Sequence, residues 1–295
     1  MNPSSHRSFS PSRVFALAWN TLTELTRQKV FYFLLIFALL TIGSSAFAAK
    51  LSFEEEFQML KDVALGSMSI FTSLLAILAT AMLLPKDTED RTLYTILAKP
   101  VPRFEYLLGK LCGVLLLLAV STLVMSALFL AVLGLREQSV LAETTAQLQG
   151  ATPAELQIAI DGVKRSTFNA NLLPGIAAIF IKSALLAAMT LFVSTFSTSS
   201  IFTTIVSIAM YFIGHLQSTA RDYWLSAMDA SWWTQAFLAV VALAFPDLQA
   251  FSLVDAVVVG SAIPFGIAIQ TLMLGVGYVA VYYVLAVFVF AGREL

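Results

Sequence analysis

Long apolar runs alternate with short polar stretches along this chain of 295 residues. Each run approaches or exceeds the roughly 20 residues that a helix needs to cross a hydrocarbon core, and a backbone surrounded by lipid must satisfy its own hydrogen bonds. We therefore predict an all-α, polytopic membrane protein whose residues 30–295 form six transmembrane helices. The predicted spans are Val30 to Ala49, Ser67 to Leu84, Leu107 to Leu133, Gly175 to Phe196, Ile201 to Leu216 and Phe265 to Ala291.

The region before the first run has a helical pattern of its own. Phe15, Trp19 and Leu22 recur at helical spacing between Ser12 and Lys29. Residues 1–29 are therefore expected to form a cytoplasmic N-terminus with an amphipathic elbow helix that Ser12 caps. This helix either lies in the headgroup plane, with Trp19 at the interface, or simply extends the first span into the cytoplasm.

The polar stretch from Pro85 to Lys110 joins the second and third predicted spans and is rich in charge. Side-chain oxygens from Asp87 to Asp90 can cap the start of a short helix, and the prolines at 100 and 102 disfavour its continuation. Three apolar residues share one face of that helix: Leu93, Ile96 and Leu97. The following residues, Arg103 to Tyr106, are expected to lie in headgroups and water. The stretch is either a solvated loop or an amphipathic helix that offers its apolar face to a partner.

Two polar segments, 136–173 and 217–264, are expected on the outer side. In the first, Thr152, Pro153 and Glu155 have the pattern of a capping box, which predicts a small helix. That helix is either a passive connector or a cover for an exit or a contact for an outer partner.

The second outer segment is rich in tryptophan. Trp224, Trp232 and Trp233 are typical of the aromatic belt at a membrane interface, so we expect them, like Trp19, to be interfacial anchors. The apolar run 232–245 has fourteen residues, which is too short for an easy crossing. We expect it to lie on the outer leaflet or to dip into it.

Composition supports the membrane assignment. Hydrophobic residues make up 59% of the chain and charged residues 12%, and the mean hydropathy is +0.85. That leaves too little polar surface to cover a soluble globule of this size. A net charge of −1 gives no basic field, which argues against nucleic-acid binding.

The distribution of lysine and arginine predicts the orientation. If the N-terminus is cytoplasmic, ten of these residues fall in inner segments and six in outer ones. Because positive residues are enriched on the cytoplasmic side, both termini and the segment 85–110 are expected in the cytoplasm.

Sequence motifs argue against chemistry by the chain itself. Gly109-Lys110 is followed by Leu111 where a P-loop needs Ser or Thr, so no Walker motif is present. The two histidines, His6 and His215, lie far apart in different contexts, and the methionines are scattered. We expect no catalytic residue, no metal ligand and no cofactor bound by this chain.

The predicted spans contain no Asp or Glu, and Lys182, about two turns into the fourth span, is their one buried-looking charge. Its side chain either snorkels to the outer headgroups or lines a substrate path. The Gly109-x-x-x-Gly113 motif on the third span could let another helix approach closely, and ordinary packing within the subunit is its expected use.

The run "EDRTLYTILAKPVPRFEYLLGKLCG", Glu89 to Gly113, resembles the segment between the second and third helices of permease subunits of type 2 ABC exporters. That class includes permeases linked to multicopper-enzyme maturation. The elbow helix, the six spans and the tight "STFSTSS" turn also resemble those permeases, whereas the outer segment 136–173 is longer than a minimal permease needs.

The resemblance implies a coupling helix that docks on a separate ATPase subunit, which would hold the ATP and magnesium. The docking residues carried over are Asp87, Glu89, Asp90, Arg91, Leu93, Ile96, Leu97, Lys99 and Arg103. It also implies a second permease copy or similar chain as partner, and a bacterial inner-membrane location. The alternatives are a membrane anchor or scaffold for a periplasmic assembly, and an ion-coupled secondary transporter.

Overall fold

The computed structural model describes residues 9–51, 56–89, 102–148, 152–226, 232–233, 236, 245–260 and 264–292. All regular secondary structure in these ranges is helical. The elements are α1 (Pro11–Thr26), α2 (Lys29–Leu51), α3 (Glu56–Ala81), α4 (Leu83–Glu89), α6 (Arg103–Gln147), α7 (Pro153–Thr167), α8 (Leu172–Phe196), α9 (Ser200–Ser226), the 3₁₀ turn η1 (Gln249–Phe251), α11 (Val254–Val259) and α12 (Phe265–Ala291).

Six helical stretches in the described ranges are long and apolar enough to cross a membrane, which confirms the predicted number of candidate spans. They are Lys29–Phe47, Glu56–Asp87, Arg103–Gln147, Pro153–Phe196, Ser200–Thr219 and Phe265–Ala291. Several continue beyond the predicted apolar runs, because hydropathy marks only the part that suits lipid and a helix can continue past it into water.

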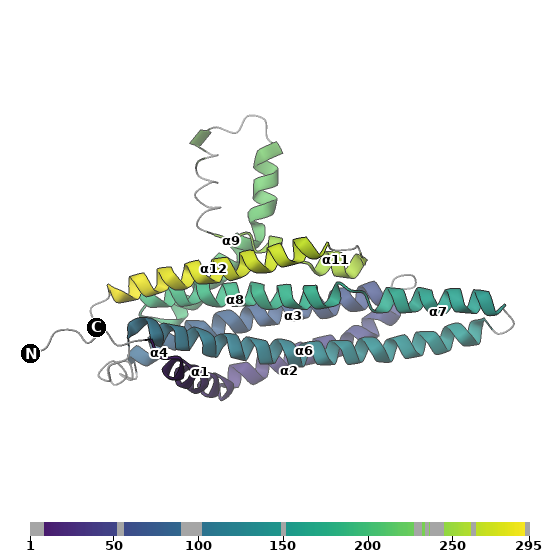
Figure 1. Cartoon of the computed structure of the whole chain (residues 1–295), viewed down its shortest axis with the longest axis horizontal. Coiled ribbons are helices and arrows are strands. Elements are labelled where there is room, and N and C mark those ends of the chain that lie inside the picture. The colour runs from purple at the N-terminus through teal and green to yellow at the C-terminus, as the bar shows by residue number, and fades with distance from the viewer. Residues whose placement is uncertain are drawn as a thin grey trace, which may run out of the picture.

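The long helices α2, α3, α6, α8 and α12 run along a common direction, and the last part of α9 stands at a steep angle to them (Figure 1). One end of the bundle carries α1, α4 and the end of α12. The other end carries α7 and α11 (Figure 1). Residues 85–89 and 102–110 and the two ends of the described chain therefore lie at the same end of the bundle (Figure 1).

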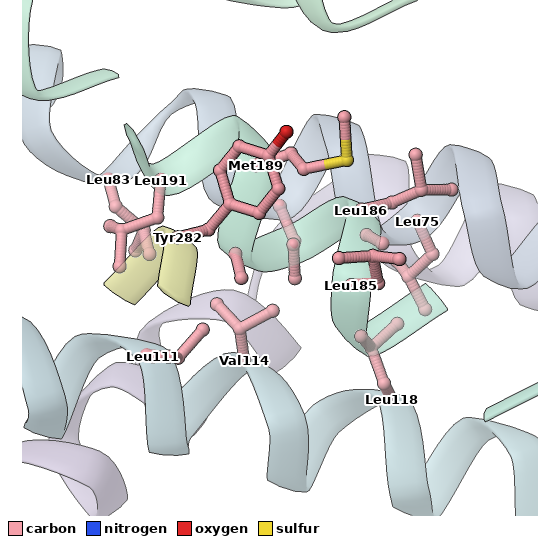
Figure 2. Close-up of a cluster of buried hydrophobic side chains, with 14 of the residues drawn as sticks. Leu75, Leu83, Leu111, Val114, Leu118, Leu185, Leu186, Met189, Leu191 and Tyr282 are labelled. Carbon is pink, nitrogen blue, oxygen red and sulfur yellow. The ribbon is translucent and has the colours of Figure 1, made fainter. Parts of the chain in front are cut away.

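The core forms where α3, α6, α8 and α12 meet. Figure 2 shows Leu75, Val114, Leu118, Leu185 and Tyr282 in this cluster. Each contributing helix places small or aliphatic residues on the shared face, so the side chains fill the space between helices. Leu248 and Phe251, from the η1 region, belong to the same buried cluster, so part of the outer segment 217–264 packs into the bundle.

In segment 136–173, the last part of α6 and the helix α7 pack against each other as a helical hairpin. The predicted capping box of α7 is confirmed, because the Glu155 amide donates to Thr152 Oγ1 at 3.4 Å and the Thr152 amide donates to Glu155 Oε2 at 2.9 Å. Arg136 pairs with Glu56 at 2.6 Å, and Lys61 Nζ donates to the Ser166 carbonyl at 2.6 Å. These contacts fasten the hairpin to α3.

The N-terminal helix forms as predicted but starts earlier. It begins at Pro11, with Ser10 and not Ser12 at the N-cap position, because proline suits the first turn of a helix. Its buried face is Val14, Ala18, Thr21 and Leu25. Phe15 and Trp19 point outward, with 64% and 59% of their surface exposed.

Candidate functional site

The predicted docking segment is described only at its two stems, 85–89 and 102–110. Six of the nine predicted docking residues lie outside the described residues: Asp90, Arg91, Leu93, Ile96, Leu97 and Lys99. The helix predicted for them remains a prediction. The structure does define how the stems are held.

The first stem differs from expectation. Asp87 was expected to cap the start of a new helix, and Glu89 likewise, but both belong to α4, which begins at Leu83. Pro85 is tolerated in its first turn because the amide that proline lacks has no helical partner there. Asp87 is buried, with 7% of its surface exposed.

Asp87 pairs with α6. Its Oδ2 lies 2.7 Å from Lys110 Nζ and accepts a short hydrogen bond from the hydroxyl of Tyr106. Tyr106 and Lys110 are four residues apart, so they lie on one face of α6. Both are almost fully buried. The pair therefore joins α4 and α6 through charges that are shielded from water.

Helix α1 completes this arrangement. Glu24 Oε1 lies 2.9 Å from Lys86 Nζ, and Glu24 Oε2 lies 3.6 Å from Lys110 Nζ. We call the five residues the stem network: Glu24, Lys86, Asp87, Tyr106 and Lys110. It holds two carboxylates and two ammonium groups, so its formal charge is balanced. Asp87 and Lys110 form its buried pair, and Glu24 and Lys86 are partly exposed.

A second ion pair fastens the other end of α1 to α6. Arg13 Nε donates to Glu105 Oε2 at 2.7 Å, and its second nitrogen donates to Oε1 at 2.8 Å. The Ser10 amide also donates to Oε1 at 3.0 Å. The hydrogen bond to Glu105 raises the pKa of the Arg13 guanidinium above its ordinary value. Glu105 and Tyr106 are buried, so the expectation that they lie in headgroups and water is wrong.

Between these contacts α1 packs closely on α6. A Cβ placed on Gly113 would lie 2.6 Å from Thr21 Cβ and 2.8 Å from the Ala18 carbonyl oxygen, and one on Gly109 would overlap Leu17. The absent side chains let the two backbones approach. The Gly109-x-x-x-Gly113 motif therefore serves packing within the subunit, as predicted.

The second stem is held by the last helix. Arg103 donates to the carbonyl oxygens of Phe290 at 3.1 Å and Ala291 at 2.7 Å, in the last turn of α12, where a positive charge suits the helix end. The Tyr283 hydroxyl donates to the Phe104 carbonyl at 2.8 Å. The two stems are therefore joined to each other and to α1 by the stem network and the Arg13–Glu105 pair, and the second stem also reaches α12 through Arg103.

Lys182 lies inside the bundle. Only 3% of its surface is exposed, and its Nζ donates to Ser69 Oγ at 2.5 Å. Because α8 begins at Leu172 and the side chain turns toward α3, snorkelling to the outer headgroups is wrong for this residue. Its role in a substrate path stays a prediction.

The predicted interfacial tryptophans are described in part. Trp232 and Trp233 are exposed and stacked, with ring centroids 3.7 Å apart. Trp224 belongs to α9, and its side chain lies outside the described atoms. Exposure of Trp19, Trp232 and Trp233 is compatible with anchoring at an interface.

Sequence reasoning missed the stem network and the Arg13–Glu105 pair. The sequence does place Tyr106 and Lys110 on one face of a helix, and likewise Arg13 and Glu24, because of their spacing. It does not show which other helix each face contacts, because contacts between separate helices produce no periodic pattern in the sequence. In the described ranges, no three His, Cys, Asp or Glu side chains cluster as metal ligands would.

A scan of the chain against protein-family models finds no match, and a search of curated proteins finds none either.

Proposed function

We propose that this chain is the permease subunit of an ATP-driven type 2 ABC exporter, located in a bacterial inner membrane and working with a separate ATPase subunit. The observation that carries the proposal is the bracing of the segment 85–110. Both of its stems are tied to membrane-spanning helices through buried or capping charges. A segment held in this way can transmit force, whereas a loosely attached loop would absorb it.

The mechanism follows from the two attachments. A push on the segment from the cytoplasm would reach α6 and α1 through the stem network, and α12 through Arg103. Because the segment is linked both to α1 and to α12, its displacement would change the angle between these two helices. Two permease chains that tilt together would open a path between them. The chain lacks a Walker motif, so ATP and magnesium belong to the partner.

The docking surface proposed for the ATPase is the apolar face of the predicted coupling helix. Burial of Leu93, Ile96 and Leu97 would contribute about 1.5 to 3 kcal/mol each before the costs of association. The surrounding charges, including Arg91 and Lys99, would set the register of the complex and the choice of partner.

Co-purification of the full chain with its partner tests the proposal. Leu93→Asp places a charge in the docking face, so we expect ATPase turnover of the complex to fall at least tenfold. The matched control is Leu135→Asp, because Leu135 is 66% exposed on the outer part of α6. Unchanged turnover in Leu93→Asp would contradict the docking assignment.

The same experiment separates the alternatives. A stable partner without ATPase activity, bound through the same segment, would favour a membrane scaffold. Transport that persists without any ATPase would favour an ion-coupled transporter.

A further inference from the structure

Lys182 lies near the middle of the bundle. It is the eleventh of the 25 residues of α8, which places it about 15 Å from the start of that helix. Ser69, its hydrogen-bond partner, lies midway along α3. A charged group at this depth is costly to keep and usually has a function.

Lys182 has little to compensate its charge. Within the described part of the chain, no carboxylate lies within ion-pair distance of its Nζ, which donates a hydrogen bond to the Ser69 hydroxyl. An ammonium group has three donors. The contrast with Lys61 is informative, because that equally buried lysine donates to a backbone carbonyl at the end of α7.

On α9, the His215 ring stacks on Tyr211. His215 Nδ1 is buried and has no hydrogen-bond partner in the described ranges. After α9, the carboxylate of Asp247 accepts the backbone amides of Gln249 and Ala250, at 3.0 and 3.3 Å.

The surrounding contacts hold these groups in place. Gly214 packs against Leu248, whose amide donates to the Gly214 carbonyl at 2.9 Å. On α12, Gly275 leaves room for Ile181, the neighbour of Lys182. The hydrogen-bonded pair Lys182–Ser69 therefore joins α8 to α3, and the neighbouring Ile181 packs on α12.

We propose that Lys182, with Ser69, recognises a compact anionic group, such as a phosphate or carboxylate, on the transported molecule. This inference rests on the proposed transport function. An ammonium and a hydroxyl can both donate to an anion, and a low-dielectric site strengthens each contact. Because Lys182 is 3% exposed, an anion reaches it only when the helices around it separate. The anion is either a lipid headgroup or a soluble ion.

Binding to the full chain without any ATPase tests the inference. The protein is reconstituted in nanodiscs of phosphatidylcholine and titrated with inorganic phosphate, and it is also reconstituted in discs that contain phosphatidylglycerol. Thermal unfolding midpoints report binding. A shift with phosphate assigns a soluble anion, and a shift only with phosphatidylglycerol assigns a lipid headgroup.

The variants are Lys182→Met, which keeps the length of the side chain, and Lys182→Gln, which keeps a polar end without charge. Loss of the charged donor is expected to weaken phosphate binding about tenfold or more, or to abolish the phosphatidylglycerol shift. Lys61→Met is the matched control and should keep the full effect.

The inference fails if neither probe shifts the parent chain, or if Lys182→Met and Lys182→Gln respond as the parent does. Failure of the proposed function looks different, because it concerns ATPase turnover and not anion binding by the isolated chain.

Discussion

Two buried lysines of the bundle, Lys110 and Lys182, differ in the partners that surround their ammonium groups. At the end that carries α4, Lys110 lies close to the carboxylates of Asp87 and Glu24, and Asp87 also accepts a hydrogen bond from the Tyr106 hydroxyl. In the middle of the bundle, the Lys182 ammonium donates a hydrogen bond to the Ser69 hydroxyl. A paired buried charge fastens helices together, because removal of one partner leaves the other uncompensated. A buried charge without a counter-ion contributes little to stability, so its retention is better explained by binding.

Replacing Lys110 should have the largest effect on stability. Lys110→Met leaves the Asp87 carboxylate buried without its ammonium partner, which is expected to cost about 3 to 5 kcal/mol. The thermal midpoint of the purified chain should therefore fall sharply. The double variant Asp87→Leu/Lys110→Met removes both charges and should recover most of the loss. Equal loss in the single and double variants would show that the network does not act as a pair.

Disturbing the contact between α1 and α6 should have the next largest effect on stability. Gly113→Leu forces a side chain against Thr21 and the Ala18 carbonyl, so α1 must move away, at a cost of about 1 to 3 kcal/mol. Gly134→Leu on the same helix is the matched control, because a Cβ there meets nothing within 4 Å. Similar thermal midpoints for the two variants would contradict the close packing of α1.

Replacing Lys182 should have the smallest effect on stability, and it should stabilise the protein or leave its stability unchanged. Lys182→Met removes a buried charge and keeps the volume of the side chain, so we expect a gain of about 1 kcal/mol or no change. The thermal midpoint without added anion measures this directly. A loss as large as that of Lys110→Met would place Lys182 among the structural charges and remove the contrast between the two sites.

Much of the fold was predictable because it depends on local patterns. The six apolar runs, the helix before them, the capping box at Thr152 and the role of Gly109 and Gly113 all follow from periodicity or spacing. The ends of helices were less predictable, since α4 starts before Pro85 and α1 starts at Pro11. Helix ends depend on neighbours that stabilise or cap them, and these are distant in sequence.

The candidate site shows the same division. Sequence reasoning found Lys182 as a charge inside a span, but it left its direction open, and the side chain turns inward to α3. It treated Glu105 and Tyr106 as boundary residues, although both are buried against α1 or α4. Burial depends on which helices pack against one another, and composition does not specify it.

The sequence by itself determined that this chain is a helical membrane protein with six candidate spans and a charged segment between the second and third, because span length and hydropathy are local properties. Only the tertiary structure decided that Asp87 meets Lys110, that Arg103 caps α12 and that Lys182 faces Ser69. Those contacts join residues on different helices, and each buried charge is tolerated because the partner that packing brings to it offsets the cost of removing it from water.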